Sequence, residues 1–298
     1  MSVFQSIILG LVQGIAEFLP ISSSGHLTLL QKIMGLEEVP LLFDVFLHLA
    51  TLLAVVLFFR KKIWELLKAF GRMIAHRPYQ KEGLSKEECL AVDKNYRRYI
   101  LAIILATIIT GCLGLVTSKI IPDLPIIYVC IGFIITAILL ILSSFIEKIQ
   151  AKKSSAKSSS KESSVEEKSL PPSEKAPSWW QALLIGLAQG IGTLPGISRS
   201  GSTIAGSLFC GVNRQQAGEF SFICSIPAIL GAFLLELKDL GQVSSNVGAI
   251  PLATGCIVAF VSGFLSLTWL MRLIKKGRLE WFACYLIPLA VLGIIFLG

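Results

Sequence analysis

The sequence predicts an all-α membrane protein built as an inverted repeat, in which each half holds a re-entrant helix hairpin and three transmembrane helices. Three observations predict this class. The 298-residue chain is 54% hydrophobic, with a mean hydropathy of +0.74 and only 15% charged residues, whereas soluble domains carry about a quarter charged residues. Long apolar stretches alternate with basic segments, and a Ser/Gly-rich motif occurs twice.

Two kinds of apolar stretch predict the helices. Two short ones, 4–19 and 180–194, stop at Pro20 and Pro195. At ~1.5 Å per residue they reach about 24 Å, less than the ~30 Å hydrocarbon core, and the polar run after each proline cannot face lipid. They therefore predict re-entrant motifs over 4–35 and 180–214. Six longer stretches predict full spans: 41–59, 99–118, 125–146, 219–238, 248–270 and 280–297.

Basic residues predict the orientation. Of the 27 Lys and Arg residues, segment 60–98 holds 11, 147–178 holds 7 and 271–279 holds 4. Cytoplasmic loops of membrane proteins carry this excess, so these three segments are predicted to be cytoplasmic and both termini external. The net charge of +8 then reflects topology, and nucleic acid is not expected as a partner.

Composition also divides the chain. Segment 151–178 is rich in Ser, Lys and Glu, cannot bury apolar surface, and is predicted to be a disordered cytoplasmic linker. It separates a first repeat, 1–150, from a second, 179–298. The seven cysteines show no metal-ligand spacing and are interpreted as small buried hydrophobic residues.

The internal repeat appears when the sequence is shifted by 176 residues, because 4–25 then aligns with 180–201 without a gap. The first copy starts outside and the second inside, so the halves are predicted to be inverted, with a site near the midplane where their broken helices meet. Helix N-termini near Gly25 and Gly201 suit an anionic ligand. The recurring residues are Gln5, Gly10, Leu11, Gln13, Gly14, Ile15, Ser22, Ser24 and Gly25.

The two copies carry different chemistry. In the first, Gln13 and Glu17 share a helical face, and Ser22–Ser24 and His26 follow. Ionisable groups at membrane depth are expensive and indicate function. The second copy supplies hydroxyl groups, glycines for close backbone approach, and a guanidinium that can clamp phosphate oxygens. These residues are Gly196, Ser198, Arg199, Ser200 and Thr203.

The stretch GIAEFLPISSSGH at 14–26, together with LPGISRSGST at 194–203, resembles the bacitracin-resistance family of undecaprenyl-pyrophosphate phosphatases. The resemblance implies hydrolysis of undecaprenyl pyrophosphate to undecaprenyl phosphate and inorganic phosphate at the external face of the bacterial cell membrane. This reaction recycles the lipid carrier for peptidoglycan synthesis and confers bacitracin resistance. The resemblance also implies a divalent cation, Mg²⁺ or Ca²⁺, for which Glu17 is the candidate ligand, and leaves the oligomeric state open, a homodimer included.

The same resemblance suggests residue roles. Ser23 or His26 is the nucleophile, a choice that the sequence leaves open, and Glu17 is the general base or orients the imidazole and a cation. Arg199 stabilises charge on the transferring phosphoryl group. The remaining candidates for substrate binding are Gln13, Ser22, Ser24, Gly196, Ser198, Ser200 and Thr203.

Other interpretations stay open. His26 can instead donate to a backbone carbonyl, and Asp44 and His48 either line the cavity mouth or lie at the membrane interface. A transporter or lipid flippase also fits, since inverted repeats with broken helices are typical of alternating access. For the enzyme, the two turns should lie within roughly 10 Å of each other. Glu17 and His26 should then converge on Arg199, the cavity should open near 41–48, and apolar grooves should admit the prenyl tail.

Overall fold

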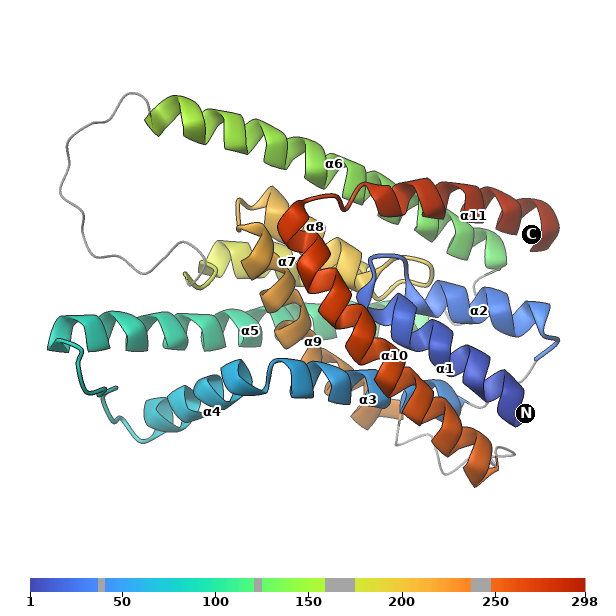
Figure 1. Ribbon diagram of the computed structural model, residues 1–298, viewed down its shortest axis with the longest axis horizontal. Helices are drawn as coiled ribbons and strands as arrows, with labels where there is room; N and C mark the ends of the chain where they lie inside the picture. The colour runs from blue at the N-terminus through green and yellow to red at the C-terminus, as the bar shows by residue number, and fades with distance from the viewer. Residues whose placement is uncertain (37–40, 121–124, 159–174, 237–247, 298) are drawn as a thin grey trace.

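The computed structural model describes residues 1–36, 41–120, 125–158, 175–236 and 248–297. Over these ranges the protein is all-helical, as predicted, with eleven helices and no strand (Figure 1). The helices of the first half are α1 (Val3–Phe18), α2 (Ser23–Ile33), α3 (Leu41–Phe58), α4 (Arg60–Ile74), α5 (Lys86–Ile120) and α6 (Ile126–Ser158). Those of the second half are α7 (Trp179–Ile191), α8 (Arg199–Phe209), α9 (Arg214–Glu236), α10 (Ala249–Lys276) and α11 (Trp281–Leu297).

Four of the described helices are long and apolar enough to cross a membrane, namely α5, α6, α9 and α10. Helix α3 meets this criterion only together with α4, from which it is bent by 82°. Helix α11 has 17 residues, which rise about 26 Å at ~1.5 Å per residue and so fall short of a ~30 Å core. The chain is a multi-pass membrane protein, but only four of the six predicted spans reach full length individually.

The connection predicted over 60–98 is largely helical, because it contains α4 and the first part of α5. Trp64, Leu67 and Ile74 expose apolar side chains on α4, while Leu66 and Ala69 are buried. Charged residues between them lower the average hydropathy, so a search for long apolar stretches does not find this amphipathic helix.

The predicted linker is shorter than 151–178. Helix α6 continues to Ser158, so residues 151–158 are helical rather than disordered. At the other end, the N–H of Ala176 donates to Asn95 Oδ1 (2.8 Å), and Arg98 Nε donates to the carbonyl of Pro177 (3.1 Å). Side chains of α5 therefore hydrogen-bond the backbone just before α7. Residues 159–174 lie outside the described ranges.

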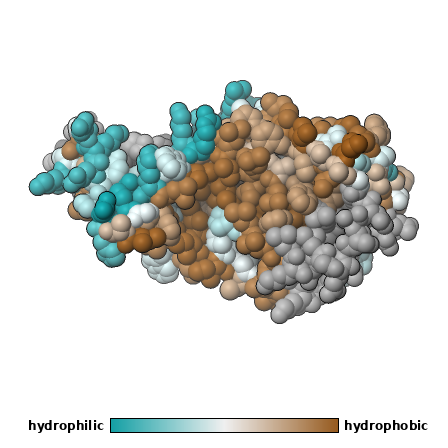
Figure 2. Space-filling model, turned by 90° about the horizontal axis from the view of Figure 1, so that it is seen from below, coloured by the Kyte–Doolittle hydropathy of each residue, from teal (hydrophilic) through white to brown (hydrophobic). Residues whose placement is uncertain are grey.

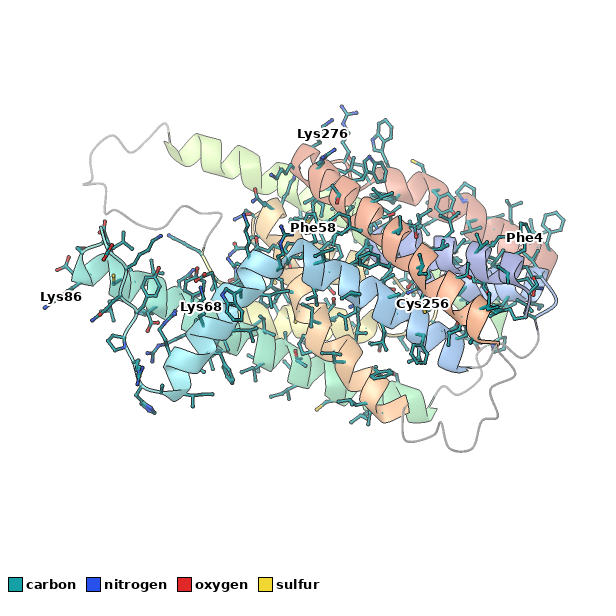
Figure 3. All side chains as sticks on the ribbon, turned by 60° about the horizontal axis from the view of Figure 1, so that its bottom comes forward. Phe4, Phe58, Lys68, Lys86, Cys256 and Lys276 are labelled. Carbon is teal, nitrogen blue, oxygen red and sulfur yellow. The ribbon has the colours of Figure 1, made fainter. Side chains whose placement is uncertain are left out.

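The surface is divided along the long axis of the molecule. Hydrophilic side chains gather at one end and hydrophobic ones cover the middle (Figure 2). Lys68 and Lys86 lie at one end and Phe4 toward the other (Figure 3). Both chain termini lie at the end opposite to the start of α5 (Figure 1). Lys276, of the third basic segment, lies near the middle of the long axis (Figure 3), so the predicted sidedness of the basic segments stays a prediction.

The two halves interlock through equivalent helix pairs. Helix α1 packs along α10, and its repeat counterpart α7 packs along α5. Glycines of the repeated motif make these contacts close, because a Cβ on Gly10 would overlap the carbonyl oxygen of Gly255, and one on Gly186 would lie 2.8 Å from Ala106 Cα. Small residues allow helices in membranes to approach closely. The repeated glycines thus let α1 and α7 pack closely against helices of the opposite half.

Replacement of Gly10 by alanine should destabilise the protein by about 1–3 kcal/mol, because the methyl group has no space against Gly255. Gly71 of α4 is the matched control, since nothing lies within 4 Å of a Cβ built there and alanine favours a helix. Thermal unfolding of both variants in detergent measures the difference. Equal midpoints would show that α1 and α10 are not tightly packed at Gly10.

Candidate active site

The two repeated turns build two helix N-termini in the same way. Ser22 precedes α2 and Ser198 precedes α8 as the N-cap residue. The N–H of Gly25 donates to Ser22 Oγ (3.3 Å), and the N–H of Gly201 donates to Ser198 Oγ (3.1 Å). Serine at an N-cap satisfies a backbone donor that has no partner within the helix. Of the two serine pairs that recur in the repeat, Ser22 and Ser198 are therefore explained first by helix capping.

The two turns are in contact, as the sequence predicts. Ser200 Oγ, after the second turn, donates to the carbonyl of Leu19, just before the first (3.3 Å). A Cβ on Gly25 would lie 3.1 Å from Gly196 Cα. Segments 176 residues apart in sequence thus form one site.

Glu17 connects the two turns. Its side chain is buried near the end of α1, and one carboxylate oxygen, Oε1, forms an ion pair with Arg199 Nη2. The other oxygen, Oε2, accepts hydrogen bonds from Ser23 Oγ (2.6 Å) and Gln13 Nε2 (3.1 Å). The structure therefore brings Glu17, Ser23 and Arg199 together, and Gln13 supports the carboxylate rather than facing the cavity.

Ser23 and Arg199 occupy equivalent positions in the repeat. Each is the first residue of its helix, α2 or α8, and each donates to the carboxylate of Glu17. One copy of the position carries a hydroxyl and the other a guanidinium. Glu17 thus contacts both the candidate nucleophile, Ser23, and the candidate phosphate-binding residue, Arg199.

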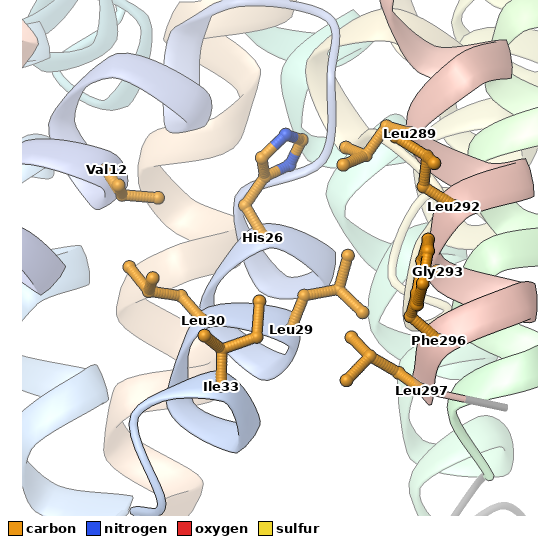
Figure 4. A pocket seen from close by; sticks show the side chains of 10 residues that line it. All are labelled: Val12, His26, Leu29, Leu30, Ile33, Leu289, Leu292, Gly293, Phe296 and Leu297. Carbon is orange, nitrogen blue, oxygen red and sulfur yellow. The ribbon is translucent and has the colours of Figure 1, made fainter.

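His26 does not converge on Arg199, which corrects the predicted arrangement. Its Nδ1 bonds the carbonyl of Ser22 (2.8 Å) and its Nε2 bonds the hydroxyl of Tyr285 (2.9 Å). The ring lines a separate apolar groove of about 340 Å³ between α2 and α11 (Figure 4). Ser22 has a φ of +69°, a conformation that costs energy for a residue with a side chain. The imidazole therefore holds the carbonyl of a strained turn residue, which matches the alternative interpretation of His26.

His48, rather than His26, is the histidine beside Glu17. Its Nε2 is 3.7 Å from Glu17 Oε2, and it lines the same cavity as Ser23 and Arg199. The sequence left His48 undecided between cavity and interface, because an apolar helix of one chain does not reveal which face a histidine occupies. The carboxylate of Asp44 is turned elsewhere and accepts from Gln31 Nε2 (3.1 and 3.2 Å).

The other predicted substrate-binding residues divide into two groups. Ser24 and Ser198 line the cavity, and Ser22 lies beneath it with its Oγ 3.4 Å from Ser24 Oγ. Ser200 instead bonds the opposite turn, and Thr203 Oγ1 donates to the carbonyl of Arg199 (2.6 Å). The second pair therefore supports the positions of the turn and of Arg199.

Gly196 is also explained by packing. Its φ is +82°, and a Cβ there would overlap the carbonyl oxygen of Val129 on α6. Only glycine fits both the left-handed conformation and the close approach. Its predicted role in binding is therefore indirect, since it lets α6 pack closely against the second turn.

A cavity of about 1010 Å³ opens over the Glu17–Arg199 pair. One of its walls comes from α5 and α9, and includes Gly114, Leu115, Ala232 and Leu235. Within 41–48, where the sequence predicted the opening, His48 lines it. The cavity thus has a charged end at the two turns and an apolar wall between two spans.

The charged end suits an anion. Arg199 Nη1 is buried and has no hydrogen-bond partner among the described residues. The N-termini of α2 and α8 begin at Ser23 and Arg199, and helix N-termini carry unpaired N–H groups and partial positive charge. A phosphate group would accept from the free guanidinium nitrogen and from these helix ends.

The residues do not form a cage for a divalent cation. The part of the chain that the structure describes contains no group of three His, Cys, Asp or Glu side chains placed to hold a metal. Both carboxylate oxygens of Glu17 already contact N–H or O–H donors. The predicted dependence on Mg²⁺ or Ca²⁺ is therefore not supported by a preformed site.

Comparison with known proteins gives matches over almost the whole chain. The model of the family described as bacitracin resistance protein BacA matches residues 6–292. A protein of Treponema denticola, named undecaprenyl-diphosphatase, is 47% identical over 100% of this chain and 99% of its own length. Proteins of the same name from Methanobrevibacter smithii and Carboxydothermus hydrogenoformans are 38% and 37% identical, over 98% and 96% of their lengths.

Proposed function

The chain belongs to the bacitracin resistance protein BacA family, and from this membership we propose that it is an undecaprenyl-diphosphatase. It is an integral membrane enzyme that hydrolyses undecaprenyl diphosphate to undecaprenyl phosphate and inorganic phosphate. Recycling of the lipid carrier for cell-wall synthesis, and with it resistance to bacitracin, follow from this reaction. Within the structure, the observation that most supports the proposal is the shared contact of Ser23 and Arg199 with the carboxylate of Glu17.

The arrangement supports Ser23 as the nucleophile. Its Oγ lies 2.6 Å from Glu17 Oε2, so the carboxylate can take the hydroxyl proton as the oxygen attacks the terminal phosphorus. The bond from that phosphorus to the bridging oxygen breaks, and undecaprenyl phosphate leaves. Water then hydrolyses the phosphoserine, which releases inorganic phosphate and restores the hydroxyl. His26 is disfavoured as the nucleophile because both ring nitrogens are engaged elsewhere.

Arg199 supplies the electrostatic part of the mechanism. Its Nη2 fixes Glu17, while its buried Nη1 is available for the phosphoryl oxygens. Charge on a transferring phosphoryl group is stabilised most by donors that are already in place. Ser24 and Ser198, which line the same cavity, add hydroxyl donors to the second phosphate.

The apolar wall of the cavity suits the prenyl chain. Helices α5 and α9 contribute Leu115, Ile229, Ala232 and Leu235 to it, and both helices are long enough to span a membrane. A lipid can therefore keep its tail along spans that face the bilayer while its diphosphate reaches the two turns. Mg²⁺ or Ca²⁺ stays a prediction of the family resemblance, and no step of the mechanism depends on it.

We also propose that the chain forms an inverted repeat in the membrane, with both termini on the external side and the site open to that side. The equivalent pairs α1 with α10 and α7 with α5 support two interlocked halves, 1–150 and 179–298. The location of both termini opposite the start of α5 supports a common side for them (Figure 1). Labelling of a Ser2→Cys variant with a thiol reagent that does not cross membranes tests this topology. Labelling in intact cells is expected, and labelling only after lysis would contradict external termini.

Release of inorganic phosphate tests the function. The purified protein in detergent should release phosphate from undecaprenyl diphosphate without any membrane gradient, as hydrolysis is downhill and needs no second compartment. A transporter or flippase would not do this. The Glu17→Gln variant serves as the matched control, because it keeps the shape of the side chain but removes the base. Phosphate release at the same rate from both proteins would contradict the proposal.

A further inference from the structure

His48 contributes a third ionisable side chain to the site, from outside both Ser/Gly-rich motifs. It lies on α3, and its side chain is 32% exposed toward the cavity that Glu17 and Arg199 line. Its Nε2 is 3.7 Å from Oε2 of Glu17, the oxygen that also accepts from Ser23. The acceptor of the serine proton therefore has an imidazole beside it.

Hydrogen bonding fixes which ring nitrogen of His48 faces the site. Nδ1 lies 2.7 Å from the backbone carbonyl of Asp44. A carbonyl oxygen can only accept, so Nδ1 carries the hydrogen and the lone pair of the neutral ring is on Nε2. The carboxylate of Asp44 accepts from Gln31, so Nδ1 of His48 bonds the backbone carbonyl of Asp44 and not its side chain. The basic nitrogen thus points at Glu17.

We propose that His48 acts through Glu17, as a positioning residue that receives the serine proton from Oε2 and keeps the base ionised during turnover. This proposal rests on the proposed phosphatase function. A carboxyl group beside the guanidinium of Arg199 is disfavoured in its neutral form. The proton that leaves Ser23 therefore needs a second acceptor, and Nε2 of His48, which lies 3.7 Å from Glu17 Oε2 and carries the lone pair of the ring, can take it.

The proton balance is then complete. As the Ser23 oxygen bonds to the terminal phosphorus, its proton passes to Glu17 Oε2 and on to His48 Nε2, which returns it to solvent through the cavity. Glu17 is left as a carboxylate and takes a proton from the water that hydrolyses the phosphoserine. That proton goes to the Ser23 oxygen as the phosphorus–oxygen bond breaks. The 3.7 Å separation must shorten during turnover, as such contacts commonly do when substrate binds.

Three variants test the proposal on the full-length protein in detergent. His48→Ala should lower kcat about 100-fold, a typical contribution of proton transfer, and leave KM within about twofold because binding energy is unaffected. Added imidazole should recover much of the loss, since it restores a base in the space that the side chain left. His48→Gln should be as slow and should not respond to imidazole, because the amide fills the space without supplying a base. His76→Ala, at an exposed histidine, controls for histidine removal.

Each outcome decides between the alternatives. Full activity of His48→Ala or of His48→Gln would overturn the proposal, since a packing role or a simple hydrogen bond would then suffice. A loss that imidazole does not restore in a folded His48→Ala protein would also overturn it. If His48→Ala fails to fold, the kcat of folded His48→Gln decides: a kcat as low as that expected for His48→Ala supports the proposal, and an unchanged kcat overturns it. If the unaltered protein releases no phosphate, the proposed function and the role of His48 are both overturned. If the unaltered protein and the His48 variants are equally active, only the role of His48 is overturned.

Discussion

Replacement of Ser23 by alanine is expected to reduce kcat by about 1000-fold or more, the scale seen when a nucleophile is removed. The hydroxyl lies 2.6 Å from Glu17 Oε2, and alanine removes both the attacking oxygen and the proton that the carboxylate would take. Phosphate release under saturating substrate measures the loss. Mass spectrometry of the acid-quenched wild-type protein should find a phosphate on Ser23 during turnover.

Ser24→Ala is the matched control for this experiment. Ser24 is the adjacent serine, lines the same cavity and lies 3.4 Å from Ser22 Oγ rather than beside Glu17. Loss of one hydrogen bond to substrate costs about 1 kcal/mol, so its effect should stay below about tenfold and fall mainly on KM. Equal losses in both variants, or a phosphate found on His26, would remove Ser23 from the role of nucleophile.

Replacement of Arg199 by lysine should reduce kcat/KM by about 100- to 1000-fold, the usual effect of removing one donor to a developing charge. Lysine keeps the positive charge beside Glu17. It loses the planar guanidinium, which holds Glu17 through Nη2 while the buried Nη1 is available to a phosphate group. Steady-state kinetics in detergent measures the loss.

Arg60→Lys is the control for the same chemical change. Arg60 is exposed at the start of α4 and donates to the carbonyl of Leu57, away from the cavity. Both variants should unfold at temperatures close to that of the unaltered protein. Near-normal turnover of Arg199→Lys would show that a point charge is enough, and that the site does not need one guanidinium nitrogen on Glu17 and another on the phosphoryl group.

Much of the fold could be predicted because membrane helices leave a strong local signal. The prolines at 20 and 195 predict where the half-helices stop, and α1 and α7 do end before them. Helix α4 could not be found in this way, since its charged residues hide its apolar face from an average over a long window. The extension of α6 to Ser158 was missed because Ser and Lys suggest disorder by composition, although neither prevents a helix from continuing.

The candidate site was predictable in part because the repeat identifies its turns. Glu17, Ser23 and Arg199 belong to the two motifs, and the contact between the motifs follows from the internal symmetry. The direction of a side chain does not follow from the motif. His26 lies in the first motif yet bonds Ser22 and Tyr285, while His48 lies outside both motifs yet approaches Glu17.

The sequence by itself determined that the chain is an all-helical membrane protein with an internal repeat, and it predicted a polar site where the two copies of the repeated motif meet. These properties depend on local hydropathy, proline positions and internal similarity, which one chain displays directly. Only the tertiary structure decided which histidine faces the carboxylate, and that Ser200, Thr203 and Gly196 support the turns. The reason is that hydrogen bonds to backbone carbonyls and packing between distant helices set side-chain direction, and neither is encoded in spacing along the chain.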